Sequence, residues 1–148
     1  MLGAIRTLIV DDSTTLRAML DLMICDHNDF RAPAHAADAL KAIRILEERS
    51  FDLVLLDINM PGMDGLQLLD HIVANGLSSV LILSSSSVPG SDISIDALKR
   101  GAIACFDKAN CIKEADKLVD LIRDIVAQKY EPTWSPETLI EAVPALYS

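Results

Sequence analysis

The sequence predicts an α/β fold, in which helices cover both faces of a doubly wound, five-stranded parallel sheet. Short apolar runs alternate along the chain with longer segments of helical period, which is the pattern of βαβ units. Polar residues end four of the apolar runs on their carboxyl side. Ligands of open α/β sheets bind at that edge, so the same pattern also predicts where a functional site lies.

Five segments are predicted as strands. The third is a continuous run of β-branched residues and leucine, so it should lie in the middle of the sheet, covered on both faces. Pro33 cannot donate a backbone hydrogen bond, which places the second strand at an edge. The predicted strands are Ile5–Val10, Phe30–Ala34, Phe51–Asp57, Val80–Leu83 and Ile103–Asp107.

Five helices are predicted to connect and follow these strands. In the first, apolar residues recur at the spacing of one helical face. Gly76 and Gly101 follow the third and fourth helices, as helix-ending glycines commonly do. The predicted helices are Thr14–Cys25, Ala36–Glu48, Asp64–Asn75, Ser91–Arg100 and Ile112–Gln128.

The composition narrows the possible partners. At 148 residues with 51% hydrophobic residues, the chain can bury a core as one domain. A net charge of −9 argues against direct binding to nucleic acid or to an anionic membrane, because both require a basic surface. No signal peptide or long apolar segment is visible, and the three cysteines, Cys25, Cys105 and Cys111, suit free thiols in a reducing compartment. A cytoplasmic location is therefore expected.

The polar residues at the strand ends carry the chemistry. Asp11 and Asp12 follow the first run, Asp57 ends the third, Ser84 the fourth, and Lys108 follows the fifth. Three carboxylates at one edge repel each other, and a hard divalent cation with oxygen ligands would offset that repulsion. The pattern predicts a Mg²⁺-assisted phosphoryl site. The Asp-Asp-Ser segment also suits a helix N-cap, and the two roles are compatible. His27, His35 and His71 lack metal-ligand spacing and are expected at the surface.

The segment LDINMPGMDG at residues 56–65 resembles the receiver domain of two-component response regulators. The resemblance extends from Ile5 to about Gln128 and implies a (βα)₅ flavodoxin-like fold with strand order 2-1-3-4-5. It implies a receiver domain at residues 1–128 and a tail with a short helix at 129–148. Within the family, the stretch with SSSSVPG and ALKRGAI is more similar to the receivers of chemotaxis methylesterases than to most transcriptional regulators. No G-x-S-x-G nucleophile motif follows, so esterase activity is not expected.

The resemblance implies that Asp57 accepts a phosphoryl group as an acyl phosphate. Mg²⁺ would be held by Asp12, Asp57 and the backbone carbonyl of Asn59, with Asp11 acting through water. The chain is then expected to be a single-domain response regulator that catalyses only its own phosphorylation and dephosphorylation.

After transfer, Lys108 would pair with one phosphoryl oxygen and the Ser84 hydroxyl would donate to another. The donor would be a sensor histidine kinase or a histidine phosphotransfer protein. It is expected to contact the exposed face of the first helix, formed by Leu16, Arg17, Leu20 and Asp21. A downstream protein would bind the face made by the fourth helix, fifth strand and fifth helix.

The chain departs from the family pattern at two positions near the site. Cys105 stands where receivers usually carry an aromatic residue, and Phe106 should point to the opposite face of the strand. Ala109 stands where proline usually follows the lysine. These departures favour one alternative, a receiver-like docking module that works without phosphorylation. A phosphatase of the haloacid-dehalogenase type is a weaker alternative, because Asp11-Asp12-Ser13 lacks its D-x-D motif.

The tail is predicted to form a short helix, begun by Ser135-Pro136 and stopped by Pro144. Leu139, Ile140 and Val143 would form an apolar stripe, with Trp134 as an anchor. A remnant linker and a regulatory lid over the downstream face are both open interpretations.

Overall fold

A computed structural model describes residues 4–59, 65–85 and 92–130. Its centre is a five-stranded sheet in which all neighbouring strands are parallel, in the order β2-β1-β3-β4-β5. The strands are β1 (Thr7–Val10), β2 (Ala34–Ala36), β3 (Leu53–Asp57), β4 (Ser79–Ser84) and β5 (Ala104–Asp107). This topology confirms the predicted fold class and strand order.

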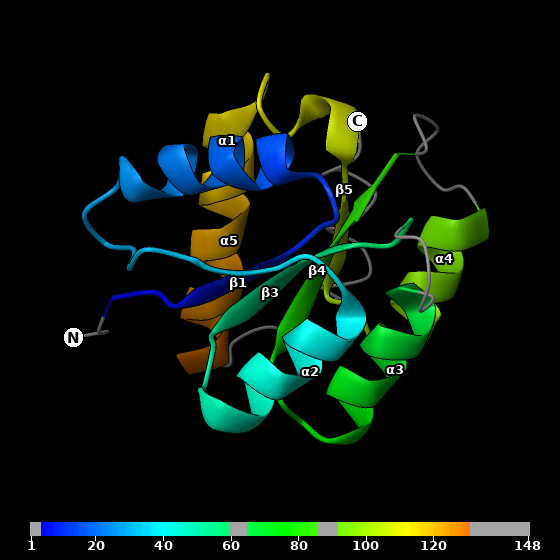
Figure 1. Ribbon diagram of the computed structural model, residues 1–148. Helices are drawn as coiled ribbons and strands as arrows, with labels where there is room; N and C mark the ends of the chain where they lie inside the picture. The colour runs from blue at the N-terminus through cyan, green and yellow to red at the C-terminus, as the bar shows by residue number, and fades with distance from the viewer. Residues whose placement is uncertain (1–3, 60–64, 86–91, 131–148) are drawn as a thin grey trace.

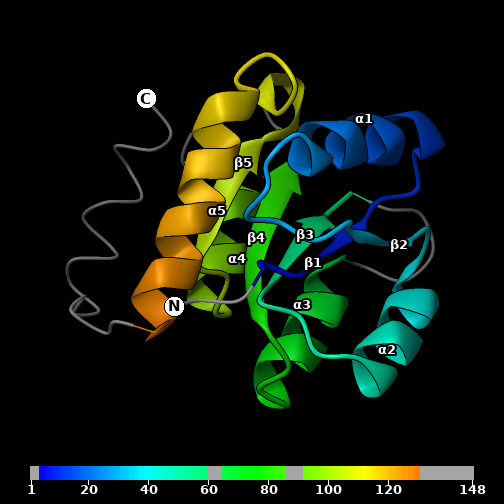
Figure 2. The same cartoon turned by 90° about the vertical axis from the view of Figure 1, so that its left-hand side faces the viewer.

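Helices cover both faces of the sheet (Figures 1 and 2). Helices α1 and α5 lie on one face, and α2, α3 and α4 lie on the other. The helices are α1 (Thr14–Cys25), α2 (Ala39–Glu48), α3 (Gly65–Ala74), α4 (Asp92–Lys99) and α5 (Ala115–Tyr130). A 3₁₀ turn, η1 (Lys108–Asn110), connects β5 to the segment before α5.

The strands divide their side chains between two apolar cores. Leu56 of β3 packs with the α2–α4 side, whereas Leu55 packs with α1 and α5. This alternation follows from the two-residue period of a strand, and both cores are needed because helices cover both faces. All five residues of β3 are buried, which confirms its predicted central position. Each such buried leucine stabilises the fold by roughly 1.5–3 kcal/mol relative to an exposed one.

The prediction for the second strand was wrong in its position. It was placed at Phe30–Ala34, but β2 spans Ala34–Ala36. Phe30 forms only an isolated bridge with Ile5, and Pro33 lacks the N–H that a continuing ladder would need. The strand does lie at the edge of the sheet, as predicted. Because β2 starts later, α2 also begins later, at Ala39 rather than Ala36, with the Asp38 side chain capping it.

The other differences concern element ends. Helix α1 has its predicted bounds, β4 is longer by one residue at each end (Ser79–Ser84), and α5 spans Ala115–Tyr130 rather than Ile112–Gln128. Leu20 was assigned to the exposed face of α1 but is fully buried, because it packs in the core between α1 and α5. The predicted helix starts at Asp64 and Ser91, and the tail features from Trp134 to Pro144, lie outside the described residues. Within the described ranges, no helix is long and apolar enough to cross a membrane.

Candidate functional site

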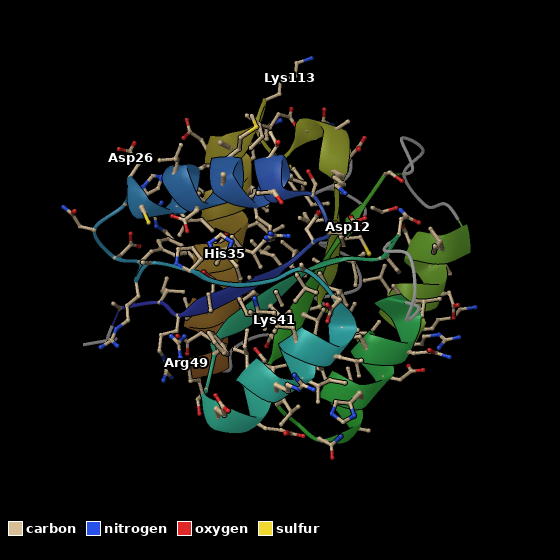
Figure 3. The ribbon with its side chains drawn as sticks, viewed as in Figure 1. Asp12, Asp26, His35, Lys41, Arg49 and Lys113 are labelled. Atoms are coloured by element: carbon tan, nitrogen blue, oxygen red, sulfur yellow. The ribbon has the colours of Figure 1, made fainter. Side chains whose placement is uncertain are left out.

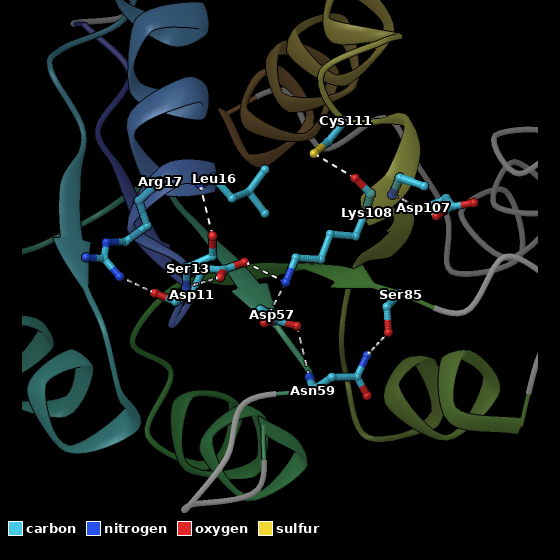
Figure 4. A network of polar contacts seen from close by, with 11 residues as sticks. Asp11, Ser13, Leu16, Arg17, Asp57, Asn59, Ser85, Asp107, Lys108 and Cys111 are labelled. Carbon is cyan, nitrogen blue, oxygen red and sulfur yellow. Dashed lines mark hydrogen bonds and ion pairs between the residues drawn. The ribbon is translucent and has the colours of Figure 1, made fainter.

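The parallel sheet brings predicted polar residues to one edge, among them Asp11, Asp57 and Lys108 (Figure 4). Asp57 is the last residue of β3 and pairs in register with Leu83 of β4. The next residue, Ser84, pairs with Asp107, the last residue of β5. Asp11 directly follows β1, the other neighbour of β3. Because the strands are parallel, their carboxyl ends meet at this edge, and residues far apart in sequence become neighbours.

Lys108 links two of the carboxylates. Its Nζ lies 2.9 Å from Oδ2 of Asp57 and 3.1 Å from Oδ2 of Asp11. Asp57 has only 1% of its side chain exposed, and that of Asp11 is fully buried, whereas 23% of the Lys108 side chain is exposed. The ammonium therefore lies beside two buried negative charges, and part of the Lys108 side chain remains exposed to solvent.

The carboxylates of Asp11 and Asp57 both interact with the ammonium of Lys108, and this affects the pKa values of Asp11 and Lys108. Burial raises the pKa of Asp11, against the lowering effects of its hydrogen bond from the Ser13 amide and of Lys108. Burial alone would lower the pKa of Lys108, but its hydrogen bond to Asp57 and its close contacts with the charges of Asp57 and Asp11 outweigh this, so the net shift is upward. Lys108 is therefore held in its charged form, whereas its charge only partly offsets the effect of burial on Asp11.

Asp12 completes an acidic cluster with Asp11 and Asp57. One carboxylate oxygen from each of the three lies within 4.8 Å of the others. Asp12 is exposed, in the loop that joins β1 to α1 (Figure 3). Oδ2 of Asp11 is buried and, although Lys108 Nζ is near, receives no hydrogen bond of good geometry. Closely spaced carboxylate oxygens are the donor set that Mg²⁺ prefers, so these residues fit a hard divalent cation.

Asn59 connects Asp57 to the neighbouring loop. Its backbone N–H donates to Oδ1 of Asp57 at 2.9 Å, and its side-chain amide donates to the Ser85 hydroxyl at 2.8 Å. The backbone of this segment also approaches α3 closely. A Cβ added to Gly65 would lie 2.7 Å from Cα of Ile58, the residue after Asp57. Glycine at the start of α3 thus lets the loop that carries Asn59 sit against the helix.

The structure places Ser84 at the same edge, with 2% of its surface exposed. The predicted residues Asp11, Asp12, Asp57, Asn59, Ser84 and Lys108 are all at or next to the carboxyl ends of β1, β3, β4 and β5. The three histidines are all partly exposed, and His35 pairs with Asp21 of α1.

The structure shows the surroundings of Cys105 and Ala109, the two residues that depart from the family pattern. Cys105 is buried on the α2–α4 side of the sheet, where its thiol donates to the Ser94 carbonyl of α4 at 3.7 Å. Phe106 packs on the opposite side, as its neighbouring position in the strand predicts. Ala109 lies in η1, and its N–H donates to the Asp107 side chain at 2.9 Å.

Sequence reasoning missed several residues that support the site. Ser13 was recognised as a cap, and its hydroxyl does accept from the Leu16 N–H. Its own N–H, however, also donates to Oδ1 of Asp11 at 2.7 Å. Arg17, assigned to the exposed face of α1, donates to the Asp11 backbone carbonyl. Ser85 contacts Asn59 across two loops that lie 26 residues apart, and no local sequence signal predicts that contact.

Comparison with known proteins decides the family. The family model of the response regulator receiver domain matches residues 7–123. The chain belongs to the response regulator receiver domains. This confirms the resemblance inferred from the LDINMPGMDG segment and leaves the haloacid-dehalogenase alternative without support.

Individual relatives of this receiver include full-length methylesterases. A protein-glutamate methylesterase/protein-glutamine glutaminase from Chromobacterium violaceum is 35% identical over 132 residues, which cover 85% of this chain and 37% of that protein. The chain thus spans well under half the length of that enzyme. The predicted likeness to methylesterase receivers is confirmed.

Solved structures agree with this placement of the receiver. The response regulator domain of Thermotoga maritima CheB has a TM-score of 0.76 and 30% identity, over 84% of this chain and 97% of that one. A structure of the P1 domain of CheA3 in complex with CheY6 from R. sphaeroides matches with a TM-score of 0.73 and 31% identity, over 85% of this chain and 99% of that one. As a response regulator receiver domain, the chain is a component of two-component signalling.

Proposed function

We propose that this receiver accepts a phosphoryl group on Asp57, in a Mg²⁺-dependent reaction, and that the phosphorylated form changes partner binding. The contact that carries the proposal is Lys108 Nζ at 2.9 Å from Asp57 and 3.1 Å from Asp11. It supports a nucleophilic carboxylate held beside one fixed cation, in an acidic cluster whose oxygen spacing suits a second.

In the proposed reaction, a carboxylate oxygen of Asp57 forms a bond to phosphorus as the phosphorus–nitrogen bond of a phosphohistidine breaks. The bonding electrons return to the ring, which leaves as neutral imidazole if its other nitrogen carried a proton. Lys108 then pairs with one phosphoryl oxygen, and the Ser84 hydroxyl donates to another. Both side chains lie at the same sheet edge as Asp57, which is what this role requires.

The metal ligands we propose are Asp12, Asp57 and the backbone carbonyl of Asn59, with Asp11 contributing through water. The 4.8 Å spacing of the three carboxylates supports this set. When bound, Mg²⁺ neutralises charge that develops on the phosphoryl oxygens and aligns the donor. Asp11 and Asp12 differ in burial, and the exposed Asp12 is better placed to bind the ion directly.

The proposed donor is a histidine kinase or a histidine phosphotransfer protein. The related structure that contains the P1 domain of CheA3 with CheY6 supports this class of partner. For the docking surface we propose the exposed part of α1, without the buried Leu20. For the downstream partner we propose the face of α4, β5 and α5. These partners are proteins, since the net charge of −9 disfavours nucleic acid.

A second candidate is a docking module that works without phosphorylation. The observation that favours it is Cys105, a small buried residue at the position where receivers usually carry a switching aromatic ring. Such a module would keep the acidic cluster but would not turn over phosphate.

One assay separates the two candidates. The protein is incubated with acetyl phosphate and Mg²⁺, and phosphorylation is followed by intact-protein mass spectrometry. We expect incorporation of one phosphoryl group, lost in Asp57→Asn and retained in Asp52→Asn, a buried aspartate just before the same strand. No incorporation by the unaltered protein would favour the docking module, and full labelling of Asp57→Asn would contradict the assignment of Asp57.

A further inference from the structure

The backbone that carries Lys108 is bonded on both sides of that residue (Figure 4). Before it, the Asp107 carboxylate accepts the N–H of Ala109 at 2.9 Å and caps the 3₁₀ turn η1. After it, the Lys108 carbonyl accepts from both the Cys111 thiol, at 3.0 Å, and the Cys111 backbone N–H, at 3.4 Å. These three hydrogen bonds leave the Lys108 backbone little freedom to turn relative to β5.

The Cys111 thiol is suited to remain a donor. The residue is fully buried in the core formed with α1 and α5. Burial raises the pKa of Cys111 to about 11, so the thiol stays protonated at neutral pH. A small apolar residue could fill this position, but it could not supply the S–H that bonds the Lys108 carbonyl.

The Asp107 cap requires that residue 109 is not proline. Ala109 stands where the family usually has proline, and only a residue with a backbone N–H can donate to Asp107. Ala109 and the Asp107 cap are therefore linked, because the cap needs the backbone N–H that proline would lack. In this chain, hydrogen bonds supply a restraint on the loop that a proline ring would otherwise supply through its fixed φ.

Restraint of the backbone matters because lysine is a long and flexible side chain. Lys108 Nζ must lie near two carboxylates from different strands, at 2.9 and 3.1 Å. A small rotation of the peptide that carries Lys108 would be multiplied along its four methylene groups. Misplacement of a catalytic group by about 1 Å can lower a rate by about 100-fold.

We propose that Asp107 and Cys111 are positioning residues for Lys108: they hold η1 so that the ammonium stays between Asp11 and Asp57. The kinetic part of this inference rests on the function proposed above, because it treats Lys108 as the residue that pairs with the phosphoryl group. The geometric part does not depend on phosphorylation.

The first test compares Cys111→Ser with Cys111→Ala and Cys111→Val. Serine keeps a donor, whereas alanine and valine remove it, alanine with a smaller side chain than cysteine and valine with a larger one. With acetyl phosphate and saturating Mg²⁺, we expect the phosphorylation rate to fall about three- to tenfold in alanine and valine, the range that loss of one hydrogen bond gives. Serine should recover most of the rate. Equal rates in all three variants would overturn the role of the thiol.

Cys105→Ala is the matched control. It also removes a buried thiol that donates to a backbone carbonyl, but on the other side of the sheet, at Ser94. Its phosphorylation rate should change less than twofold. For the cap, Asp107→Asn keeps an accepting oxygen and Asp107→Ala does not, so the asparagine variant should be the faster of the two.

A double-mutant cycle shows whether Cys111 acts through Lys108. In a Lys108→Ala background, Cys111→Ala should produce no further fall in rate, because the side chain that it positions is absent. An equal fall in both backgrounds would assign the effect to general packing and overturn the proposal.

A measurement without phosphorylation keeps this inference separate from the proposed function. Nuclear magnetic resonance of the Lys108 ammonium reports how fast its hydrogens exchange with water. We expect several-fold faster exchange in Cys111→Ala than in Cys111→Ser. If acetyl phosphate labels no variant but this difference is seen, the function fails and the positioning role stands. Identical exchange in both variants would overturn the positioning role, whatever the labelling shows.

Discussion

Lys108 Nζ lies 2.9 Å from Oδ2 of Asp57, although 51 residues separate the two in the chain. The contact reaches across β4, which lies between β3, the strand that carries Asp57, and β5, the strand that precedes Lys108. The ammonium crosses the end of β4 to reach both Asp57 and Asp11. The position of this one ammonium therefore affects the charge balance at both carboxylates.

Replacing Lys108 with alanine should destabilise the protein when Mg²⁺ is absent. The buried carboxylate of Asp11 and that of Asp57 would lose their shared counter-charge, at a cost of about 1–3 kcal/mol in the free energy of unfolding. Urea unfolding in EDTA measures this difference. In saturating Mg²⁺ the difference should shrink, because a bound cation offsets the same charges. An equal deficit in EDTA and in Mg²⁺ would contradict a metal site at these residues.

Asp12→Ala should weaken Mg²⁺ binding by about tenfold or more, because it removes a charged ligand from the acidic cluster. Isothermal titration calorimetry on the unphosphorylated protein measures the affinity directly. Asp26→Ala is the control, since Asp26 is an exposed carboxylate at the far end of α1 (Figure 3). An unchanged affinity in Asp12→Ala would move the metal away from this residue.

Gly65→Ala should cost about 1–3 kcal/mol of stability, because the added Cβ would overlap the backbone of Ile58 at 2.7 Å. The strain falls next to Asp57, so the phosphorylation rate should fall as well. Gly76→Ala separates the two effects. Its φ of +60° makes alanine unfavourable by about 1 kcal/mol, but nothing lies within 4 Å of the added atom. Urea unfolding should detect both losses, and the phosphorylation assay should detect only the first.

Asp29→Asn should lower stability by up to about 1 kcal/mol at pH 7, the range for exposed ion pairs. Arg123 of α5 donates to both carboxylate oxygens of Asp29, at 2.7 and 3.0 Å, and these hydrogen bonds lower the pKa of Asp29 from 3.8. A lowered pKa in the folded state means that the stabilisation is present above about pH 4 and is lost as the pH falls through the folded value.

Urea unfolding at pH 7, 5 and 3 tests this dependence. The difference between Asp29→Asn and the unaltered protein should be similar at pH 7 and 5 and smaller at pH 3. Asp124→Asn, which alters an exposed carboxylate elsewhere on α5, is the control and should show little difference at any of these pH values. A difference that grew toward pH 3 would show that the ion pair does not stabilise the fold.

The sequence by itself determined the architecture and the residue types of the site. Short apolar runs and helical-period patterns are local, so β1, β3, β4, β5 and α1 could be located from the chain alone. The run of buried residues in β3 indicated its central place, and the polar residues at strand ends indicated the functional edge. The parallel topology then made Asp57, Ser84 and Lys108 neighbours without any knowledge of their contacts.

Only the tertiary structure decided which atoms meet. The position of β2 depended on the Ile5–Phe30 bridge and on where a ladder past Pro33 could begin. The burial of Leu20 depended on the packing of α1 and α5 over the same face of the sheet. The pairing of Lys108 with two carboxylates, and the bonds from Asp107 and Cys111 that flank it, depend on side-chain directions. Such contacts join segments through space, so no local pattern in the sequence encodes them.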